Sequence, residues 1–257
     1  MAETVFLLEL GESGYLTSLS APFPESCEQA NWLARDTLYA CITSQHRPHT
    51  LLDSKCVIPV GSIQFVDRFL ISHGLKHIQA MNIPPELEQE RFLARRIFRD
   101  VGKEQLPQIE KSYGPLLIKP GRRPKLFEAA RSKDFAVVLP NDEPLFVSQF
   151  LSEAIVAEWR VFLLRGRIID IRPYVLDQWC CPDLPTITGM AQALSRYAAL
   201  ALDVGVLSGG RTVAIECHPF ISCGLYGFEG PDMLRMAKAA WLAELRRQGR
   251  VAPYQIR

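Results

Sequence analysis

Two carboxylates near the C-terminal end of the chain have a spacing that could place them opposite each other on a sheet. Two apolar, strand-like segments flank Gly209-Gly210, a pair typical of two-residue hairpin loops. Counting back from that loop sets Asp203 across from Glu216, and alternation brings His218 and Ala214 to the same face. Opposed carboxylates repel each other unless a cation lies between them, which favours Mg²⁺, an ion that takes oxygen ligands. A solvated hairpin face with two unrelated acids is the alternative.

Basic side chains accompany two other strand-like segments upstream. The apolar run 114–118 ends in Lys119, a point charge well placed for a phosphate group. Lys125 closes the basic turn that follows. Glu158 and Arg160 begin a further apolar strand, where burying charges is unfavourable unless a ligand or partner compensates. An ordinary solvated basic loop remains the alternative for the turn.

The first part of the chain is predicted to alternate strand and helix. Ser26 with Gln29 predicts a helix start, and the apolar stripe of that helix extends to Cys41. Ser62 predicts the cap of a second helix that stops at Gly74. Pro84-Pro85 predicts a third helix running to about Arg99, because proline fits the first helical turn.

The rest of the chain is predicted to be rich in strands, with few helices. We expect one helix over about 187–202, ahead of the hairpin, and a terminal helix from Pro231. The fold class is therefore α+β, with an N-terminal α/β lobe. The expected strands cover residues 116–119, 136–139, 145–149, 158–164 and 167–175.

Composition narrows the class of protein and its partners. Hydrophobic residues make up 48% of the 257 residues and charged residues 22%, values typical of a globular protein with a sizeable core. Lys and Arg number 29 against 28 Asp and Glu, so the total charge argues against nucleic acid and anionic membranes as partners. No apolar run approaches the ~20 residues of a membrane span. The absence of a signal-peptide pattern and an odd count of seven cysteines favour a cytoplasmic protein with reduced thiols.

The order of these segments resembles the ATP-grasp fold over roughly residues 95 to 228. It is most similar to a divergent bacterial and phage clade formerly listed as a domain of unknown function. The resemblance implies three lobes, at 1–105, 106–155 and 156–257, with ATP held between the second and third. The residues that carry it are Val57 to Ser62, Asn82-Ile83-Pro84, Arg95, Ile118-Lys119-Pro120, Lys125-Leu126-Phe127, Glu158 to Phe162, Asp203, and Glu216 to Gly227.

The resemblance also implies ATP and Mg²⁺ (or Mn²⁺) as ligands and assigns a role to each matching residue. Lys119 would bind phosphates, Gln149, Phe150 and Leu151 would lie against adenine, Glu153 would face the ribose, and Arg95 is one of the clade's basic positions. Arg160, Lys125 and Arg172 would be catalytic, and Asp203, Glu216 and His218 would hold the metal.

Two of these positions depart from the family's pattern. His218 stands where ATP-grasp proteins usually have Asn, and an imidazole ligand moves preference from Mg²⁺ toward Mn²⁺. A two-residue Arg165-Gly166 loop would pair Trp159 with Arg172 and point Arg172 away from Arg160. A bulge in that hairpin would correct the register; otherwise Arg172 is structural.

The implied function is an ATP- and Mg²⁺-dependent ligase that joins a carboxylate to an amine or thiol through an acyl phosphate. Peptide-bond or amino-acid ligation falls within this class, with small molecules or peptides as substrates. The alternative is an ATP-binding regulatory or partner-binding module without catalysis. The sequence leaves the acid, the amine and the oligomeric state open, a homodimer included.

Overall fold

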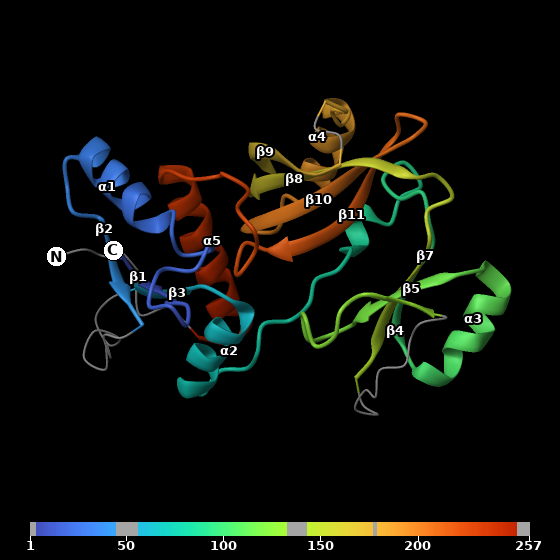
Figure 1. Cartoon of the computed structure of the whole chain (residues 1–257), viewed down its shortest axis with the longest axis horizontal. Helices are drawn as coiled ribbons and strands as arrows, with labels where there is room; N and C mark the ends of the chain where they lie inside the picture. The colour runs from blue at the N-terminus through green and yellow to red at the C-terminus, as the bar shows by residue number, and fades with distance from the viewer. Residues whose placement is uncertain (1–3, 45–55, 133–142, 177–178, 251–257) are drawn as a thin grey trace.

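The computed structural model describes residues 4–44, 56–132, 143–176 and 179–250, which form three sheets (Figure 1). The first sheet is parallel, and the other two are antiparallel. The fold is therefore α+β, as the sequence predicts. Among the described residues, no helix combines the length and the apolar character that crossing a membrane would require. The strand predicted at 136–139 lies outside the described residues.

The N-terminal lobe is a three-stranded sheet in the order β2-β1-β3. Its elements are β1 (Thr4–Leu8), α1 (Phe23–Ala34), β2 (Tyr39–Thr43), β3 (Cys56–Val60) and α2 (Ile63–Ser72). Every residue of β1 and β3 is buried. The predicted cap of α2 is confirmed, since the hydroxyl of its N-cap serine accepts a hydrogen bond from the amide three residues on.

The prediction for the first helix was wrong at both ends. α1 begins at Phe23, and the Ser26 hydroxyl donates to the Pro22 carbonyl and accepts from the Gly230 amide instead of capping the helix. Arg35 ends α1 in the left-handed conformation, and Cys41 lies in β2. The hydroxyl thus ties α1 to the start of the C-terminal helix.

The middle sheet has the strand order β4-β7-β5-β6. Its elements are β4 (Ile97–Val101), α3 (Leu106–Tyr113), β5 (Leu116–Pro120), β6 (Ala130–Arg131) and β7 (Leu145–Gln149), with a short 3₁₀ turn, η2, at Lys103–Gln105. β4 joins this sheet although it precedes the lobe boundary predicted at residue 105. The three-lobe division remains a prediction in its boundaries.

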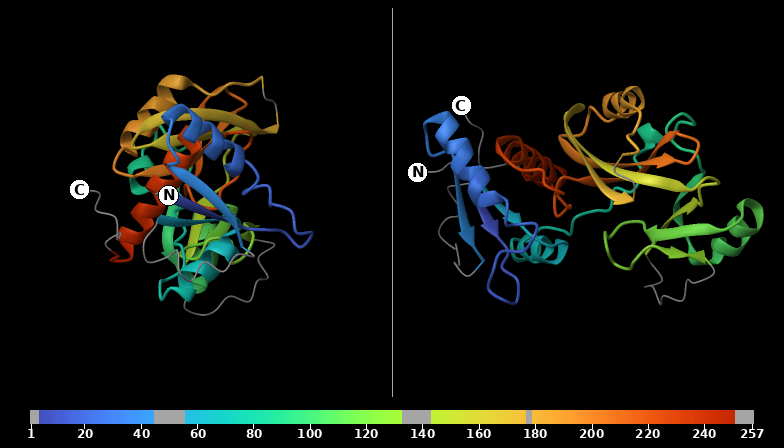
Figure 2. Two further views of the ribbon diagram at one scale, coloured as in Figure 1. Left: turned by 90° about the vertical axis from the view of Figure 1, so that its left-hand side faces the viewer. Right: turned by 45° about the horizontal axis from the view of Figure 1, so that its top comes forward.

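The C-terminal sheet has the strand order β11-β10-β8-β9. Its elements are β8 (Ile155–Leu164), β9 (Arg167–Leu176), α4 (Leu184–Ala193), β10 (Ala199–Leu207) and β11 (Thr212–Pro219). One face packs against α4 and the turn η1, and the other packs against the C-terminal helix α5. In Figure 1 and in the right-hand view of Figure 2, α5 lies between this sheet and the N-terminal lobe.

Two predicted helices are largely absent. The helix expected from Pro84 to Arg99 is a 3₁₀ turn, η1 (Pro85–Leu87), followed by an irregular segment and then β4, which pairs with β7. The helix expected over 187–202 ends at Ala193, and its second half belongs to β10. Every residue of β10 is buried, and a strand covered on both faces loses the alternation that distinguishes it from a helix.

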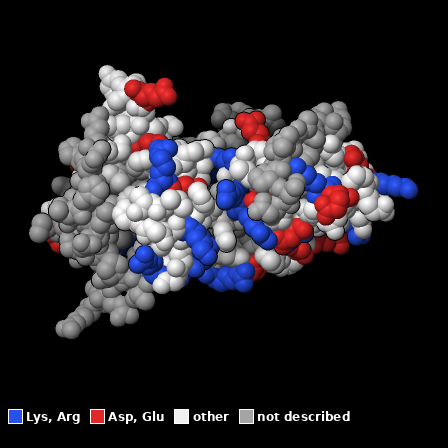
Figure 3. All heavy atoms as spheres, turned by 90° about the horizontal axis from the view of Figure 1, so that it is seen from below, with Lys and Arg blue, Asp and Glu red and all other residues white. Residues whose placement is uncertain are grey.

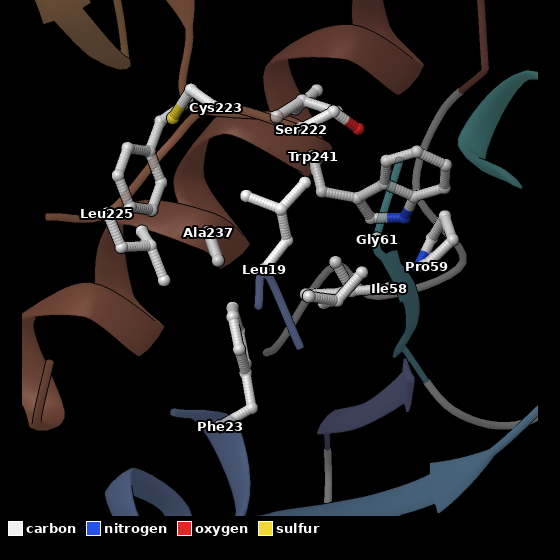
Figure 4. Close-up of a pocket in the computed structure, with 13 residues that line it drawn as sticks. Leu19, Phe23, Ile58, Pro59, Gly61, Ser222, Cys223, Leu225, Ala237 and Trp241 are labelled. Atoms are coloured by element: carbon white, nitrogen blue, oxygen red, sulfur yellow. The ribbon is translucent and has the colours of Figure 1, made fainter. Parts of the chain in front are cut away.

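The C-terminal helix α5 (Pro231–Arg247) begins where the sequence predicts. It packs on α1 and β10, and Trp241 contacts the ring of Phe69 on α2 at 5.9 Å between centroids. A cavity of about 30 Å³, seen in Figure 4, lies beside Trp241 where α5 meets the N-terminal sheet. Its volume is about that of a single water molecule, so this region is core and not a ligand site.

Candidate functional site

Four charged side chains form one row across the C-terminal sheet. Asp203 on β10 is paired with Glu216 on β11 and, on its other side, with Arg160 on β8. Arg160 is in turn paired with Arg172 on β9. Directly paired residues of neighbouring strands share a face, so the sheet presents this row of charges on one side.

The predicted pairing of Asp203 with Glu216 is confirmed, but the hairpin reaches it by a different route. The loop has three residues, because the Leu207 amide donates to the Arg211 carbonyl and the Gly210 amide donates to Leu207. That loop shifts the register by one residue, and a bulge at Ile215 shifts it back. The bulge also interrupts the alternation of side chains along β11.

Ala214 therefore does not share the face of Glu216 and His218, contrary to the prediction. It packs with Cys217 in the core cluster on the opposite face, beneath α4. A bulge places two residues opposite one, so side chains before and after it change sides relative to a regular strand.

Arg95 holds the bulge of β11 from outside the sheet. Its Nη1 and Nη2 donate to the carbonyls of Ala214 and Ile215, each at 3.0 Å. The Ala214 amide donates to the Phe92 carbonyl at 2.8 Å, so the segment before β4 binds both sides of the bulge. Burial lowers the pKa of Arg95 to about 10, an effect that the nearby Glu216 opposes. The guanidinium thus binds backbone next to a candidate metal ligand.

Arg160 and Asp203 form a buried, two-point ion pair. Nε and Nη2 of Arg160 each lie 2.7 Å from an oxygen of Asp203, and the two residues are 6% and 4% exposed. Burial by itself would raise the pKa of Asp203, but the hydrogen bonds from Arg160 and His218 hold it below its ordinary value. Asp203 is therefore ionised, with both oxygens in contact with a guanidinium.

Three further groups hold Arg160 in place. Its Nη1 donates to the Gly224 carbonyl at 3.0 Å, and its guanidinium lies 5.5 Å from the ring of Tyr174 and 5.0 Å from that of Tyr226. The two rings stack on each other at 4.8 Å, and the Tyr174 hydroxyl donates to Glu158 at 2.6 Å. Sequence reasoning missed both tyrosines, because neither belongs to a motif with a readable role.

The three predicted metal ligands lie together. One ligand atom from each of Asp203, Glu216 and His218 falls within 4.8 Å of the others. Nε2 of His218 is 3.7 Å from Oδ2 of Asp203 and 3.7 Å from Oε2 of Glu216. Two carboxylates and an imidazole make a donor set that fits a divalent cation, with the imidazole favouring a transition metal over Mg²⁺. Their role as ligands stays a prediction.

Lys119 reaches this triad from the middle sheet. It lies on β5, and its Nζ is 2.8 Å from Oε2 of Glu216 on β11. The two side chains are 17% and 25% exposed, so water is partly excluded from the pair. This contact bridges two sheets across 97 positions of sequence.

A cleft of about 350 Å³ brings together the residues predicted to bind nucleotide. Glu153 accepts a hydrogen bond from the Gly209 amide at 2.9 Å, which joins the cleft to the tip of the β10–β11 hairpin. Among the described residues, the Leu151 amide donates no hydrogen bond, so it is available to the edge of a base. The lining residues are Arg95, Leu117, Lys119, Phe146, Ser148, Gln149, Phe150, Leu151, Glu153, Ala154, Ile155 and Ile215.

Gln149 serves the protein's own backbone. Its Nε2 donates to the Tyr113 carbonyl at 2.8 Å, and its Oε1 accepts from the Arg96 amide at 3.1 Å. The side chain thereby joins β7 to the end of α3 and to the start of β4. Phe150, 38% exposed, is left as the aromatic side chain open to a ligand in this cleft.

A second cavity, of about 620 Å³, lies on the other side of Lys119. Lys119, Lys125, Glu216 and His218 contribute to its wall, as do Gln64 at the start of α2 and Glu128. Lys125 is exposed, and no side-chain hydrogen bond joins it to another described residue. Figure 3 shows Lys and Arg side chains gathered across the middle of the underside of the molecule.

Asn82 is a structural residue of this cavity that sequence reasoning left without a role. Its Nδ2 donates to the Pro120 carbonyl at 3.0 Å, and its own carbonyl accepts from the Cys217 amide at 2.6 Å. It is 6% exposed and adopts a φ of 52°, a conformation that Asn tolerates better than most residues. It therefore joins the strand of Lys119 to that of Glu216. A polar residue beside Pro84 was the available signal.

Arg172 is placed by a second bulge. The β8–β9 register shifts between Phe162 and Leu163, which brings Arg172 opposite Arg160. The first of the two sequence alternatives, a correcting bulge, is therefore confirmed. Nε of Arg172 donates to Asp170 at 2.7 Å, and the side chain is 40% exposed. It lies in the charged row, but its partner is Asp170 and not the triad.

Comparisons with known proteins place this geometry in a wider group. A family model described as an ATP-grasp domain, family 2 of its clade, matches residues 92–236. No curated protein sequence matches the chain.

Solved structures show the same fold at low identity. D-cycloserine synthetase DcsG has a TM-score of 0.57 at 12% identity, covering 93% of this chain and 99% of its own. A RimK domain ATP-grasp protein from Sphaerobacter thermophilus has a TM-score of 0.52 at 12% identity, covering 95% and 98%. D-alanine–D-alanine ligase from Bacillus anthracis has a TM-score of 0.50 at 12% identity, covering 96% and 100%.

Proposed function

The chain belongs to the ATP-grasp domain family whose model it matches, and from this membership we propose that it is an ATP-dependent ligase joining a carboxylate to an amine or a thiol. One observation carries the proposal: two cavities meet at Lys119. A phosphoryl group passes from a nucleotide to an acceptor only if both lie beside it. Two cavities on either side of one cation support such a transfer better than nucleotide binding alone.

The smaller cleft is the proposed nucleotide site. The adenine would lie against Phe150, with the Leu151 amide at its edge and Glu153 beside the ribose, and the phosphates would extend to Lys119. The volume of about 350 Å³ lies within the range of cofactor sites in proteins. Arg95 lines this cleft but binds the β11 backbone, so we assign it to the support of the metal ligands.

The larger cavity is the proposed acceptor site, with amino acids and peptides as the first candidates. A carboxylate oxygen of the acceptor attacks the γ phosphorus, and the bond from that phosphorus to the bridging oxygen breaks, so ADP leaves. The amine nitrogen or the sulfur then attacks the acyl carbon. A C–N or C–S bond forms, the C–O bond to phosphate breaks, and phosphate and a proton are released.

The residues act mainly by position and charge. Lys119 and Lys125 offset the charge of the phosphates and of the group in transfer. Asp203 and Glu216, with His218 as third ligand, would hold a divalent cation, which supplies charge neutralisation at the phosphates when it is bound. Arg160 keeps Asp203 ionised and oriented, so we assign it a positioning role, while the role of Arg172 stays a prediction.

ADP release over a panel of amino acids and peptides tests the proposal. We expect wild-type ADP production to be stimulated by an acceptor, and Lys119→Ala or Glu216→Ala to abolish it while circular dichroism stays unchanged. Lys111→Ala, on the exposed face of α3, is the matched control and keeps its activity. Wild-type turnover in both site variants contradicts the assignment. Tight ATP binding without acceptor-stimulated ADP favours the non-catalytic module.

A further inference from the structure

An ion pair closes the candidate metal site in the absence of ligands. Nζ of Lys119 lies 2.8 Å from Oε2 of Glu216, and the same oxygen lies 3.7 Å from Nε2 of His218. The ammonium therefore sits on the carboxylate oxygen that faces the other predicted ligands. Because Arg160 donates to both oxygens of Asp203, each carboxylate of the triad already has a cation beside it.

This pairing weakens the attraction of the triad for a free divalent cation. Carboxylates attract such ions chiefly through their negative charge, and here two cations balance two carboxylates. A metal ion bound at Oε2 of Glu216 would also lie close to the Lys119 ammonium. Like charges repel strongly where side chains are only 17% and 25% exposed, since water screens them poorly.

The two counter-ions differ in how firmly they are held. Arg160 is buried, bonds both oxygens of Asp203 and also donates to Gly224. Lys119 has one hydrogen bond from its ammonium within the described residues, and a lysine carries its charge on a flexible stem. It also lines both cavities. Lys119 can therefore leave Glu216 for another anion, whereas Arg160 is fixed.

We propose that Lys119 is an exchangeable counter-ion for Glu216. It neutralises Glu216 while the nucleotide is absent, and it moves to the polyphosphate when a nucleotide enters, which leaves Glu216 to the metal. The inference rests on the proposed nucleotide site and goes beyond it, because it gives one lysine two alternating partners. Metal and nucleotide then bind cooperatively, and each raises the affinity for the other by the same factor.

Each ligand measured alone tests the exchange. Without nucleotide, we expect Lys119→Met to raise the affinity for Mn²⁺ about tenfold, a typical size for such coupling, as followed by electron paramagnetic resonance. Without metal, in EDTA, we expect Glu216→Gln to raise the affinity for AMPPNP by a similar factor in calorimetry, because Lys119 is then free. Both variants keep the length of the native side chain, and urea unfolding verifies that they fold.

Two matched variants separate the specific contact from general electrostatics. Lys125→Met and Glu128→Gln remove single charges from the wall of the same cavity without breaking the Lys119–Glu216 pair, so their effects should be about threefold or less. An unchanged or lower Mn²⁺ affinity in Lys119→Met overturns the inference, as does an equal rise in Lys125→Met.

The proposed function can fail separately. A wild-type chain that binds no AMPPNP in the presence of Mg²⁺ contradicts the nucleotide site and, with it, the second partner of Lys119. The Mn²⁺ measurement on Lys119→Met contains no nucleotide, so it still decides whether Lys119 blocks the metal site.

Discussion

The C-terminal sheet and the middle lobe hold their charges in opposite ways. In the C-terminal sheet, Arg160 and Asp203 are 6% and 4% exposed and bind each other at two points. On the middle lobe, Lys125 and the neighbouring Arg122 and Arg123 are exposed. The first region has satisfied its charges within the fold, while the second leaves its cations to solvent and ligands.

The difference distinguishes charges that build the site from charges that serve the ligand. A buried pair is strongly coupled to stability, because removing one partner leaves the other charge buried and uncompensated. An exposed cation contributes little to stability but attracts anions. The Lys119–Glu216 pair lies between the two extremes, and it joins the two regions.

Asp203→Ala should produce the largest loss of stability. It leaves the Arg160 guanidinium buried without its partner, so we expect the free energy of unfolding to fall by about 3–5 kcal/mol. Glu216→Ala breaks a partly exposed pair and should lower it by about 1 kcal/mol or less. Urea unfolding at pH 7 measures both. Equal losses would show that the two regions do not differ in this respect.

Arg95→Met should weaken metal binding through the β11 bulge. The two carbonyls held by Arg95 lie directly before Glu216, and loss of groups that orient metal ligands reduces affinity by about 10–100-fold. We expect a loss of about tenfold in Mn²⁺ affinity, with Arg95→Lys partly restoring it. The adjacent exposed Arg96 offers a control, since Arg96→Met should leave Mn²⁺ affinity unchanged.

His218→Asn should change metal preference more than it changes affinity. Exchanging an imidazole for an amide oxygen moves the donor set toward hard ions, so activity with Mg²⁺ should gain relative to activity with Mn²⁺, by about tenfold or less. Parallel assays with the two metals measure the ratio. If the ratio is the same in both proteins, His218 is no ligand and the carboxylates alone hold the ion.

Lys125→Ala should leave stability almost unchanged. The side chain is exposed and unpaired within the described residues, so we expect the free energy of unfolding to stay within about 0.5 kcal/mol of the wild-type value. Acceptor-stimulated ADP production should nevertheless fall. A loss of stability without a loss of activity would place Lys125 among the charges that build the fold.

Part of the site was predictable because it depends on neighbours in sequence. The pairing of Asp203 with Glu216 follows from strand alternation around a glycine loop, although two errors of one residue cancelled: the loop is longer, and the bulge at Ile215 compensates. The cap at Ser62 was also predictable, because a hydroxyl and an amide three residues apart form a local contact.

By itself, the sequence determined the α+β class, the strands of the charged row, and the residue types of the triad. The tertiary structure alone decided that Arg95 binds β11, that residues 97–101 form a strand, and that Lys119 lies on Glu216. Strand and turn patterns arise from local sterics and alternation, which neighbouring residues carry. Contacts across about a hundred residues depend on how whole sheets pack, and burial on both faces of β10 removed the periodicity that would have identified it.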